Sequence, residues 1–256
     1  MIHPLRIPGS MRVFALLTGA CLAAAFPLAT SAMDSTPRGH TAFPSAVPGP
    51  DDVVRQALAD LETLDRCLQT GESESRDRAD GVALQRLRTL YVLSVEDADR
   101  LDPARSVRQE LTGTEWGRRT GGDLLQAYSG ALEMLEAKHG FWPNARLRHM
   151  RVGLERLDSA VAADPRDVEV RYLRLVSTAF LPGILRRSES IREDLAVLAR
   201  LLPDAVEDFP MRTYDAMAST LLELLPTDHP DRPSVEGAHE RALSESRPLA
   251  PGCRGS

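Results

Sequence analysis

The sequence is poor in aromatic residues, in lysine and in net positive charge. Phenylalanine, tryptophan and tyrosine make up only 5% of the 256 residues, which argues against a β-sandwich, because strands favour aromatic and β-branched side chains. Lysine occurs once, at Lys138, so nearly all of the 31 basic side chains are arginines. The formal net charge of −6 disfavours general nucleic-acid binding, which requires a basic surface that neutralises phosphates.

The sequence also lacks the spacings of known catalytic and metal sites. No two of its six histidines lie three or four residues apart, the helical spacing that zinc sites commonly use. It contains no Gly-x-Ser-x-Gly elbow, no phosphate-cradling glycine loop and no dinucleotide-binding fingerprint. We therefore predict no catalytic residues, no metal ligands and no cofactor.

The first 32 residues have the pattern of an export signal. Arg12 precedes an apolar run over 13–26, and residues 30–32 are small, which suits cleavage after Ala32. The apolar run is short for a membrane span, so we expect residues 1–32 to be removed and no stable span to remain. Removal takes away two arginines and no acid, which leaves a net charge of −8. We therefore expect a periplasmic or secreted protein.

Two cysteines remain after the signal is removed, Cys67 and Cys253. Disulfides persist in the oxidising compartments that exported proteins enter, so one interpretation is a long-range bridge that pins the C-terminal tail. The other is that Cys67 is a small buried apolar residue and Cys253 lies in a disordered tail over 247–256. Sequence spacing does not decide between the two, because a bridge depends on geometry.

The sequence after residue 32 predicts an all-α fold. Residues 33–50 contain four prolines and are predicted to form a linker before a helical domain over 51–246. Apolar residues there recur at helical rather than alternating spacing, which predicts seven or eight helices. They are expected over 51–70, about 84–102, 123–139, 143–163, from 168, from 190, from 210 and over 234–246, with a helical turn at 107–111 and a glycine-rich break at 113–122.

The spacing of the four tyrosines indicates a repeat. They stand at positions 91, 128, 172 and 214, and spacings near 40 residues are typical of helical-hairpin repeats. Each such unit buries its apolar face only against its neighbours.

One segment resembles a tetratricopeptide repeat. The small, large, small and proline positions of the second repeat helix are matched by Gly153, Leu157, Ala160 and Pro165, and Asp164 with Pro165 resembles the turn between repeats. Upstream, Tyr128 and its neighbours Leu125, Ser129 and Leu132 resemble the first helix.

The two helices are separated by about a dozen residues more than a 34-residue unit allows, and residues 141–144 lie in this excess. Residues 124–202 are also similar to uncharacterised exported bacterial proteins of tetratricopeptide-like type. The resemblance implies a tetratricopeptide-like α-solenoid that binds proteins and has no catalytic activity.

The densest positive charge lies on the helix after Pro143. One hypothesis is that these side chains bind a carboxylate or phosphate group, because guanidinium donates two parallel hydrogen bonds to either; the other is a solvated outer face. The residues are Arg146, Arg148, His149, Arg151 and Arg156, next to Trp142. Arg171 and Arg174 on the following helix are predicted to join this face if the two helices pack antiparallel, and the resulting surface would suit an acidic peptide.

Three aromatic residues near this face allow two interpretations. Phe141, Trp142 and Phe180 either fill the space left by the excess residues or form an exposed anchor. We favour core packing, because a small helical domain needs its large side chains inside.

The function that these observations favour is an exported, non-catalytic module that binds another protein or an acidic peptide segment, as an adaptor or accessory protein of the bacterial envelope. An alternative is a small anionic-ligand carrier or an enzyme that uses the 146–156 face. A third is a structural subunit of a larger envelope assembly.

Overall fold

A computed structural model describes residues 50–70, 76–179, 181, 187–245, 249, 250 and 253. The chain divides into two units, residues 1–53 and 54–256, and only the start of one helix is described in the first. The predicted export signal, the linker before residue 50, Phe180 and most of the predicted tail lie outside the described residues. Apart from residues 50–53, all described residues belong to the second unit.

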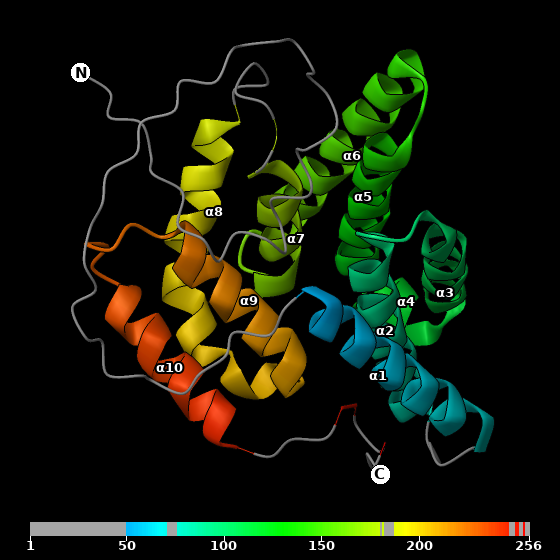
Figure 1. Ribbon diagram of the computed structural model, residues 1–256, viewed down its shortest axis with the longest axis horizontal. Helices are drawn as coiled ribbons and strands as arrows, with labels where there is room; N and C mark the ends of the chain where they lie inside the picture. The colour runs from blue at the N-terminus through cyan, green and yellow to red at the C-terminus, as the bar shows by residue number, and fades with distance from the viewer. Residues whose placement is uncertain are drawn as a thin grey trace, which may run out of the picture. The chain divides into compact units, whose positions relative to one another are not determined.

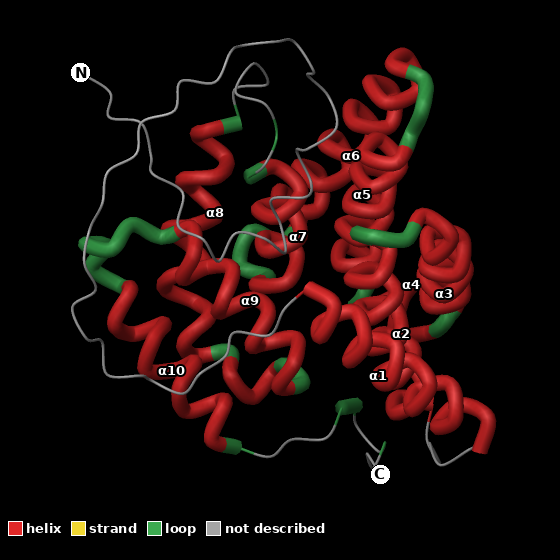
Figure 2. Tube along the Cα trace, in the orientation of Figure 1, coloured by secondary structure: helices red, strands yellow, loops and turns green. Residues whose placement is uncertain are grey.

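The regular structure of the described residues is helical, joined by turns and loops, with no strand beyond one isolated bridge between Ala250 and Cys253 (Figures 1 and 2). The predicted all-α class is confirmed. The helices are α1 (Pro50–Thr70), α2 (Arg76–Ser94), α3 (Leu101–Gly113), α4 (Glu115–Arg119), α5 (Gly122–His139), α6 (Pro143–Ala163), α7 (Val168–Thr178), α8 (Ser188–Leu201), α9 (Met211–Leu224) and α10 (Arg232–Ser244), with 3-10 turns η2 (Ala98–Arg100), η4 (Leu202–Asp204) and η5 (Val206–Asp208).

These ten α-helices in the described residues exceed the predicted seven or eight because the segment between α2 and α5 is more ordered than expected. Pro103 was expected to end a helix, but it lies in the first turn of α3, where the missing N–H costs nothing. Four apolar side chains of α3 at helical spacing are buried: Leu101, Ala104, Val107 and Leu111. α4 forms inside the predicted glycine-rich break because the Thr114 hydroxyl accepts a hydrogen bond from Gly117 N at 3.1 Å.

Two apolar clusters form the core, and α7 belongs to both. The first is built by α1, α2, α3, α5 and α6, and the second by α8, α9 and α10. Val170 and Leu173 of α7 face the first cluster, whereas Leu175 belongs to the second. α7 therefore lies between the two groups of helices, as Figure 1 shows.

A third, small cluster surrounds a disulfide between Cys67 and Cys253, whose Cα atoms lie 6.0 Å apart. It packs the end of α1 against α2 and the C-terminal segment through Leu64, Val82 and Ala250. Of the two interpretations of these cysteines, the long-range disulfide is the one present in the structure. It joins residues 186 positions apart in the sequence.

α5 and α6 form a long hairpin whose backbones touch. A Cβ placed on Gly153 would lie 2.8 Å from Gly130 O, and one placed on Gly130 would lie 2.8 Å from Gly153 O. Only glycine allows this approach, which lets Leu157 pack fully buried beside it. The turn after α6 is where the sequence predicts it, because Asp167 caps α7 by accepting a hydrogen bond from Val170 N at 2.9 Å.

Within the described ranges, no helix combines the length and the apolar character that crossing a bilayer requires.

Candidate functional site

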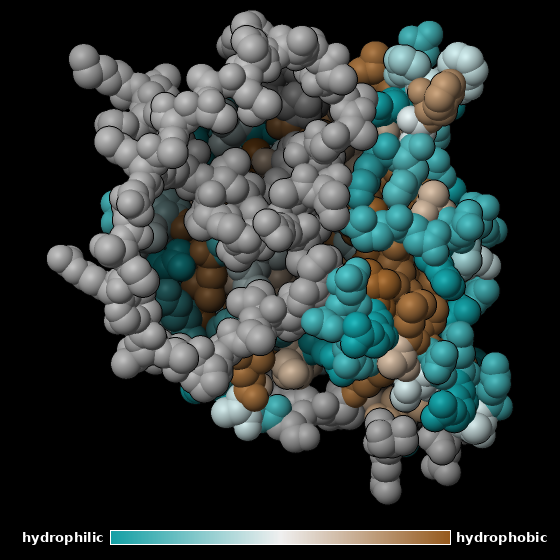
Figure 3. All heavy atoms as spheres, in the orientation of Figure 1, coloured by the Kyte–Doolittle hydropathy of each residue, from teal (hydrophilic) through white to brown (hydrophobic). Residues whose placement is uncertain are grey.

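The turn between α5 and α6 exposes three large apolar side chains, which we call the aromatic tip. Phe141 is 83% exposed, Trp142 is 69% exposed, and their rings meet edge to face with centroids 5.1 Å apart. Leu147, one turn into α6, is 59% exposed. Figure 3 shows apolar atoms at this end of the hairpin, at the upper right, among hydrophilic ones. The packing interpretation of Phe141 and Trp142 is therefore wrong.

Phe141 and Trp142 are exposed because of where the residues that exceed a standard repeat unit lie. They do not form a loop that needs filling; they lengthen α5 and α6, and only residues 140–142 remain as the turn. Pro143 starts α6 at a position that suits proline. The aromatic side chains consequently lie beyond the core that the rest of the hairpin builds.

The positive face predicted on α6 divides into side chains with structural contacts and side chains exposed to solvent. Arg146 Nε donates to Ala137 O at 2.9 Å and thereby satisfies a carbonyl in the last turn of α5. His149 Nδ1 lies 2.7 Å from Glu133 Oε2, so a carboxylate of α5 faces the imidazole. Arg148 and Arg151 are exposed, and Arg148 Nη2 lies 3.4 Å from His149 Nε2.

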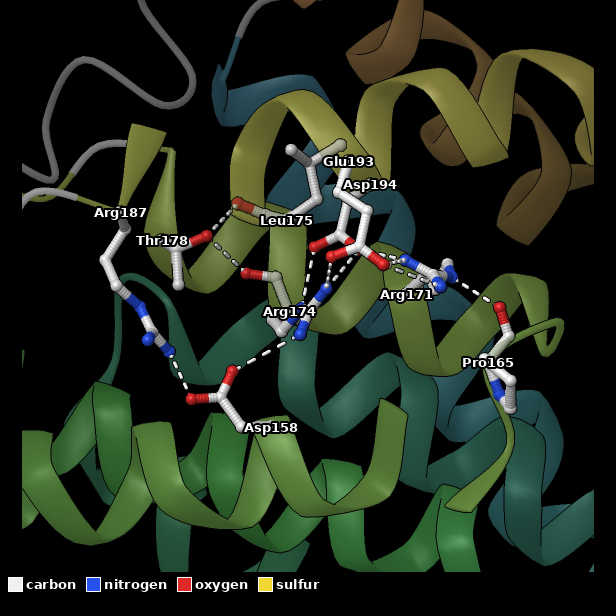
Figure 4. A network of polar contacts seen from close by, with 9 residues as sticks. All are labelled: Asp158, Pro165, Arg171, Arg174, Leu175, Thr178, Arg187, Glu193 and Asp194. Atoms are coloured by element: carbon white, nitrogen blue, oxygen red, sulfur yellow. Dashed lines mark hydrogen bonds and ion pairs between the residues drawn. The ribbon is translucent and has the colours of Figure 1, made fainter. Parts of the chain in front are cut away.

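The prediction that Arg171 and Arg174 join this face is wrong, because both are buried in a separate ionic cluster (Figure 4). Asp194 of α8 is fully buried and accepts from Arg171 Nη1 at 2.8 Å, and from Arg174 Nε at 2.9 Å and Nη2 at 2.8 Å. Arg171 Nε also donates to Pro165 O at 2.5 Å. The i,i+3 spacing of the two arginines thus directs them at one carboxylate on α8.

This buried arginine network, Arg171 and Arg174 with Asp158, Glu193 and Asp194, extends to the surface through its outer carboxylates. Arg174 Nη1 donates to Asp158 Oδ1 of α6 at 3.3 Å, and Arg171 Nη1 donates to Glu193 Oε1 at 3.1 Å. Burial opposes the charge of Arg174, but hydrogen bonds and attraction to Asp194 outweigh it and raise the pKa of Arg174. The network therefore joins α6, α7 and α8, and we interpret its arginines as structural.

A second buried carboxylate joins α2, α5 and α7, and sequence reasoning missed it. Glu169, only 3% exposed, accepts from Arg88 Nε at 2.8 Å and Nη2 at 2.5 Å, and from the Tyr128 hydroxyl at 2.6 Å. Burial and the neighbouring Glu169 raise the pKa of Tyr128 well above its ordinary value. Tyr91 packs edge to face on Tyr128, with centroids 5.8 Å apart. The contacts of Glu169 are thus with the protein itself, and we interpret the cluster as structural.

No protein-family model matches this chain, and searches of curated proteins and of solved structures find no significant similarity. The function proposed below therefore rests on the geometry of this chain alone.

A cleft of about 480 Å³ between α3, α5 and α6, which we call the arginine cleft, is a further site that sequence reasoning missed. Its polar lining consists of Arg108, Thr112, Gln126, Ser129 and Arg156. Arg156 was predicted as part of the α6 face, but Arg108 and Thr112 belong to α3, which was expected to be only a helical turn. The signal that would have revealed them is the spacing of four residues that places Arg108 and Thr112 on one side of a helix.

Among the described residues, no three side chains of histidine, cysteine, aspartate or glutamate gather as metal ligands would.

Proposed function

We propose that this protein is an exported, non-catalytic helical module that binds another protein or a peptide segment through the aromatic tip. The observation that carries the proposal is the exposure of Phe141, Trp142 and Leu147 together at one turn. Single exposed apolar residues are common on protein surfaces, whereas clustered ones mark interaction sites. Aromatic side chains in such a position are the usual anchors of interfaces.

The charge beside the tip indicates the chemistry of the partner. Arg148 is exposed one residue after Leu147, and Arg151 is exposed one turn further along α6. A partner that presents an apolar pocket with carboxylates at its rim would satisfy both the rings and the guanidiniums. This agrees with the acidic peptide segment expected from the sequence.

We further propose a tetratricopeptide-like repeat arrangement, with α5–α6 and α7–α8 as successive hairpins. The close approach of Gly130 to Gly153 and the capped turn at 164–167 support this proposal, because repeat helices pack through small residues and are joined by short turns. Export to the periplasm or the medium is supported by the apolar run over 13–26 and by the disulfide, since disulfides persist in oxidising compartments.

Photo-crosslinking tests the proposed binding. A photoreactive phenylalanine derivative placed at position 142 of the full chain, in cells that export it, should yield one dominant protein adduct. The same group at position 243 is the control, because Leu243 is 51% exposed but lies on α10. An adduct of equal yield at both positions, or adducts with lipid alone, would contradict the proposal.

The second step uses the purified partner and measures affinity directly. Replacing both Phe141 and Trp142 by alanine should weaken binding by roughly 2 kcal/mol or more, about 30-fold, as for interface hot spots. Leu243→Ala should change it less than about twofold. Because the two rings are exposed, the double variant should keep the melting temperature of the wild type, so that lost binding is not lost folding.

A further inference from the structure

Arg108 in the arginine cleft is a half-buried cation without a partner among the described residues. Its neighbours are compensated: Arg105 pairs with Asp102 at 3.2 Å and with Glu136 at 2.5 Å, and Arg156 Nη1 lies 3.1 Å from Glu133 Oε1. No such carboxylate approaches Arg108 within the described ranges. Burial and repulsion from Arg156 and Arg105 lower the pKa of Arg108, which means that its surroundings disfavour the charge.

The groups around Arg108 are donors of hydrogen bonds. Arg156 uses only Nη1 for Ser129 and Glu133, and its remaining N–H groups have no partner in the described part of the chain. The lining adds the amide of Gln126 and the hydroxyl of Ser129, which accepts from Arg156 Nη1 at 2.8 Å and keeps its own hydrogen to donate. The Thr112 hydroxyl, in contrast, already donates to Arg108 O at 2.9 Å. Gly122, which also lines the cleft, is the first residue of α5, so the positive end of that helix dipole lies on the same side.

We propose that the arginine cleft binds a phosphate dianion, either free or as the terminal group of a small organic phosphate. A tetrahedral phosphate offers three acceptor oxygens and a charge near −2 at neutral pH, which matches two guanidiniums and two neutral donors, Gln126 and Ser129, better than a planar carboxylate does. The volume of about 480 Å³ is within the range of small-molecule sites. This inference is independent of binding at the aromatic tip.

A comparison within the molecule supports the choice of site. Another cleft, of about 520 Å³, lies between the starts of α2 and α4 and is also lined by arginines. Its lining includes Asp77, Asp80 and Glu115, which would repel an anion. The residues that line the arginine cleft include no carboxylate.

Calorimetric titration of the full chain with inorganic phosphate and with phosphoserine, at constant ionic strength, tests the proposal. Saturable binding with a Kd of about 1 mM or below is expected for at least one of them, together with a rise in Tm. Tighter binding of phosphoserine would identify an organic phosphate as the ligand, and equal binding would identify the phosphate group alone. Chloride and acetate at the same ionic strength should not reproduce the rise in Tm.

Arg108→Gln provides the decisive variant. It should weaken phosphate binding at least tenfold, and in phosphate-free buffer its Tm should equal or exceed that of the wild type, because an uncompensated charge is removed. Ser129→Ala should weaken binding by a smaller factor and keep the fold. The control is Arg200→Gln, which removes the same charge from an exposed position on α8 and should leave binding unchanged.

Three results would overturn the proposal. The first is the absence of saturable binding of either phosphate compound. The second is unchanged binding in Arg108→Gln, or the same loss in Arg200→Gln, which would reduce the effect to general charge screening. The third is a folding failure of Arg108→Gln, because it would show that Arg108 has a structural partner.

Discussion

Asp194 offers the sharpest test of how this fold is held together. It is fully buried and is the shared acceptor of Arg171 and Arg174, whose side chains are 4% and 7% exposed. Asp194→Asn preserves the size of the side chain but removes the negative charge from between two buried cations. Breaking a buried ion pair on one side costs about 3–5 kcal/mol. Here Arg171 and Arg174 would lose their only fully buried acceptor and keep only the more exposed carboxylates of Asp158 and Glu193. At roughly 2–4 °C per kcal/mol for a domain of this size, Tm should fall by about 6–20 °C.

The measurement is equilibrium unfolding in urea at pH 7 with the disulfide intact, followed by circular dichroism, so that a free energy is obtained from the midpoint and slope. Glu193→Gln is the matched control on the same turn of α8, since the Glu193 side chain is 53% exposed and screened by solvent. Its loss should stay below about 1 kcal/mol. A loss below 1 kcal/mol for Asp194→Asn as well would refute the interpretation of the network as a buried ionic joint.

A third variant separates the stability of the network from its geometry. Replacing Arg171 and Arg174 by methionine and Asp194 by leucine removes all three charges together. Because apolar groups of similar volume often replace buried ion pairs without loss, this variant should be more stable than Asp194→Asn. If it is less stable, the ion pairs themselves contribute net stability to the α7–α8 contact.

Three further perturbations have outcomes that follow from the structure. Gly153→Ala should lower the free energy of unfolding in urea by about 1–3 kcal/mol, because the new Cβ would lie 2.8 Å from Gly130 O. Gly237→Ala is the control and should be neutral or stabilising, because the nearest atom to its Cβ would be 3.7 Å away. Equal effects of the two substitutions would contradict the close contact. Reducing the disulfide should lower the unfolding free energy by roughly 2–5 kcal/mol, and Cys67→Ser should reproduce that value without reductant; no change would mean that the bridge is not formed. Alkaline pH should also destabilise the fold, since burial raises the pKa of Tyr172 to about 12 and also raises the pKa values of Tyr91 and Tyr128. The unfolded chain loses these protons from about pH 10 while the folded chain retains them, so stability is complete below pH 10 and falls by about 1.4 kcal/mol per pH unit for each tyrosine above it. Urea unfolding at several pH values checks the slope, which Tyr172→Phe should reduce.

The helices were largely predictable because their signal is local. Apolar side chains at helical spacing mark α5 and α6 within a residue or two, and the structure has both helices where the pattern places them. Only the turn at 107–111 of α3 is predicted, because Pro103 is typical of a helix end although proline is tolerated in a first turn. The exposure of Phe141 and Trp142 is not predicted, because the need of a small domain for large side chains in its core does not show that residues in excess of a repeat unit lengthen two helices instead.

The ion-pair partners of the arginines could not be predicted from the sequence, because an ion pair depends on which side chain lies opposite in the folded structure. Arg171 and Arg174 resemble a surface pair by spacing, but their acceptor Asp194 lies on another helix, 23 and 20 residues further along the chain. Arg88 and its acceptor Glu169 are separated by 81 positions. Local charge patterns do not show which carboxylate lies opposite an arginine, so the density of arginine on α6 did not reveal that Arg146 and Arg156 have contacts on α5.

In a chain this rich in arginine, whether an arginine has a carboxylate partner indicates its role better than the number of arginines nearby does. A buried guanidinium without a counter-ion lowers the free energy of unfolding. If such an arginine served only for packing, a neutral side chain of similar size would make the fold more stable. Arg88, Arg171 and Arg174 each have a carboxylate within 3 Å and are explained as structural joints. Arg108 is half-buried, has no such carboxylate among the described residues and faces a cleft lined by donors. Its unpaired charge is accounted for if the counter-ion is a ligand, and this is why the stability of Arg108→Gln in phosphate-free buffer is informative in addition to its phosphate affinity.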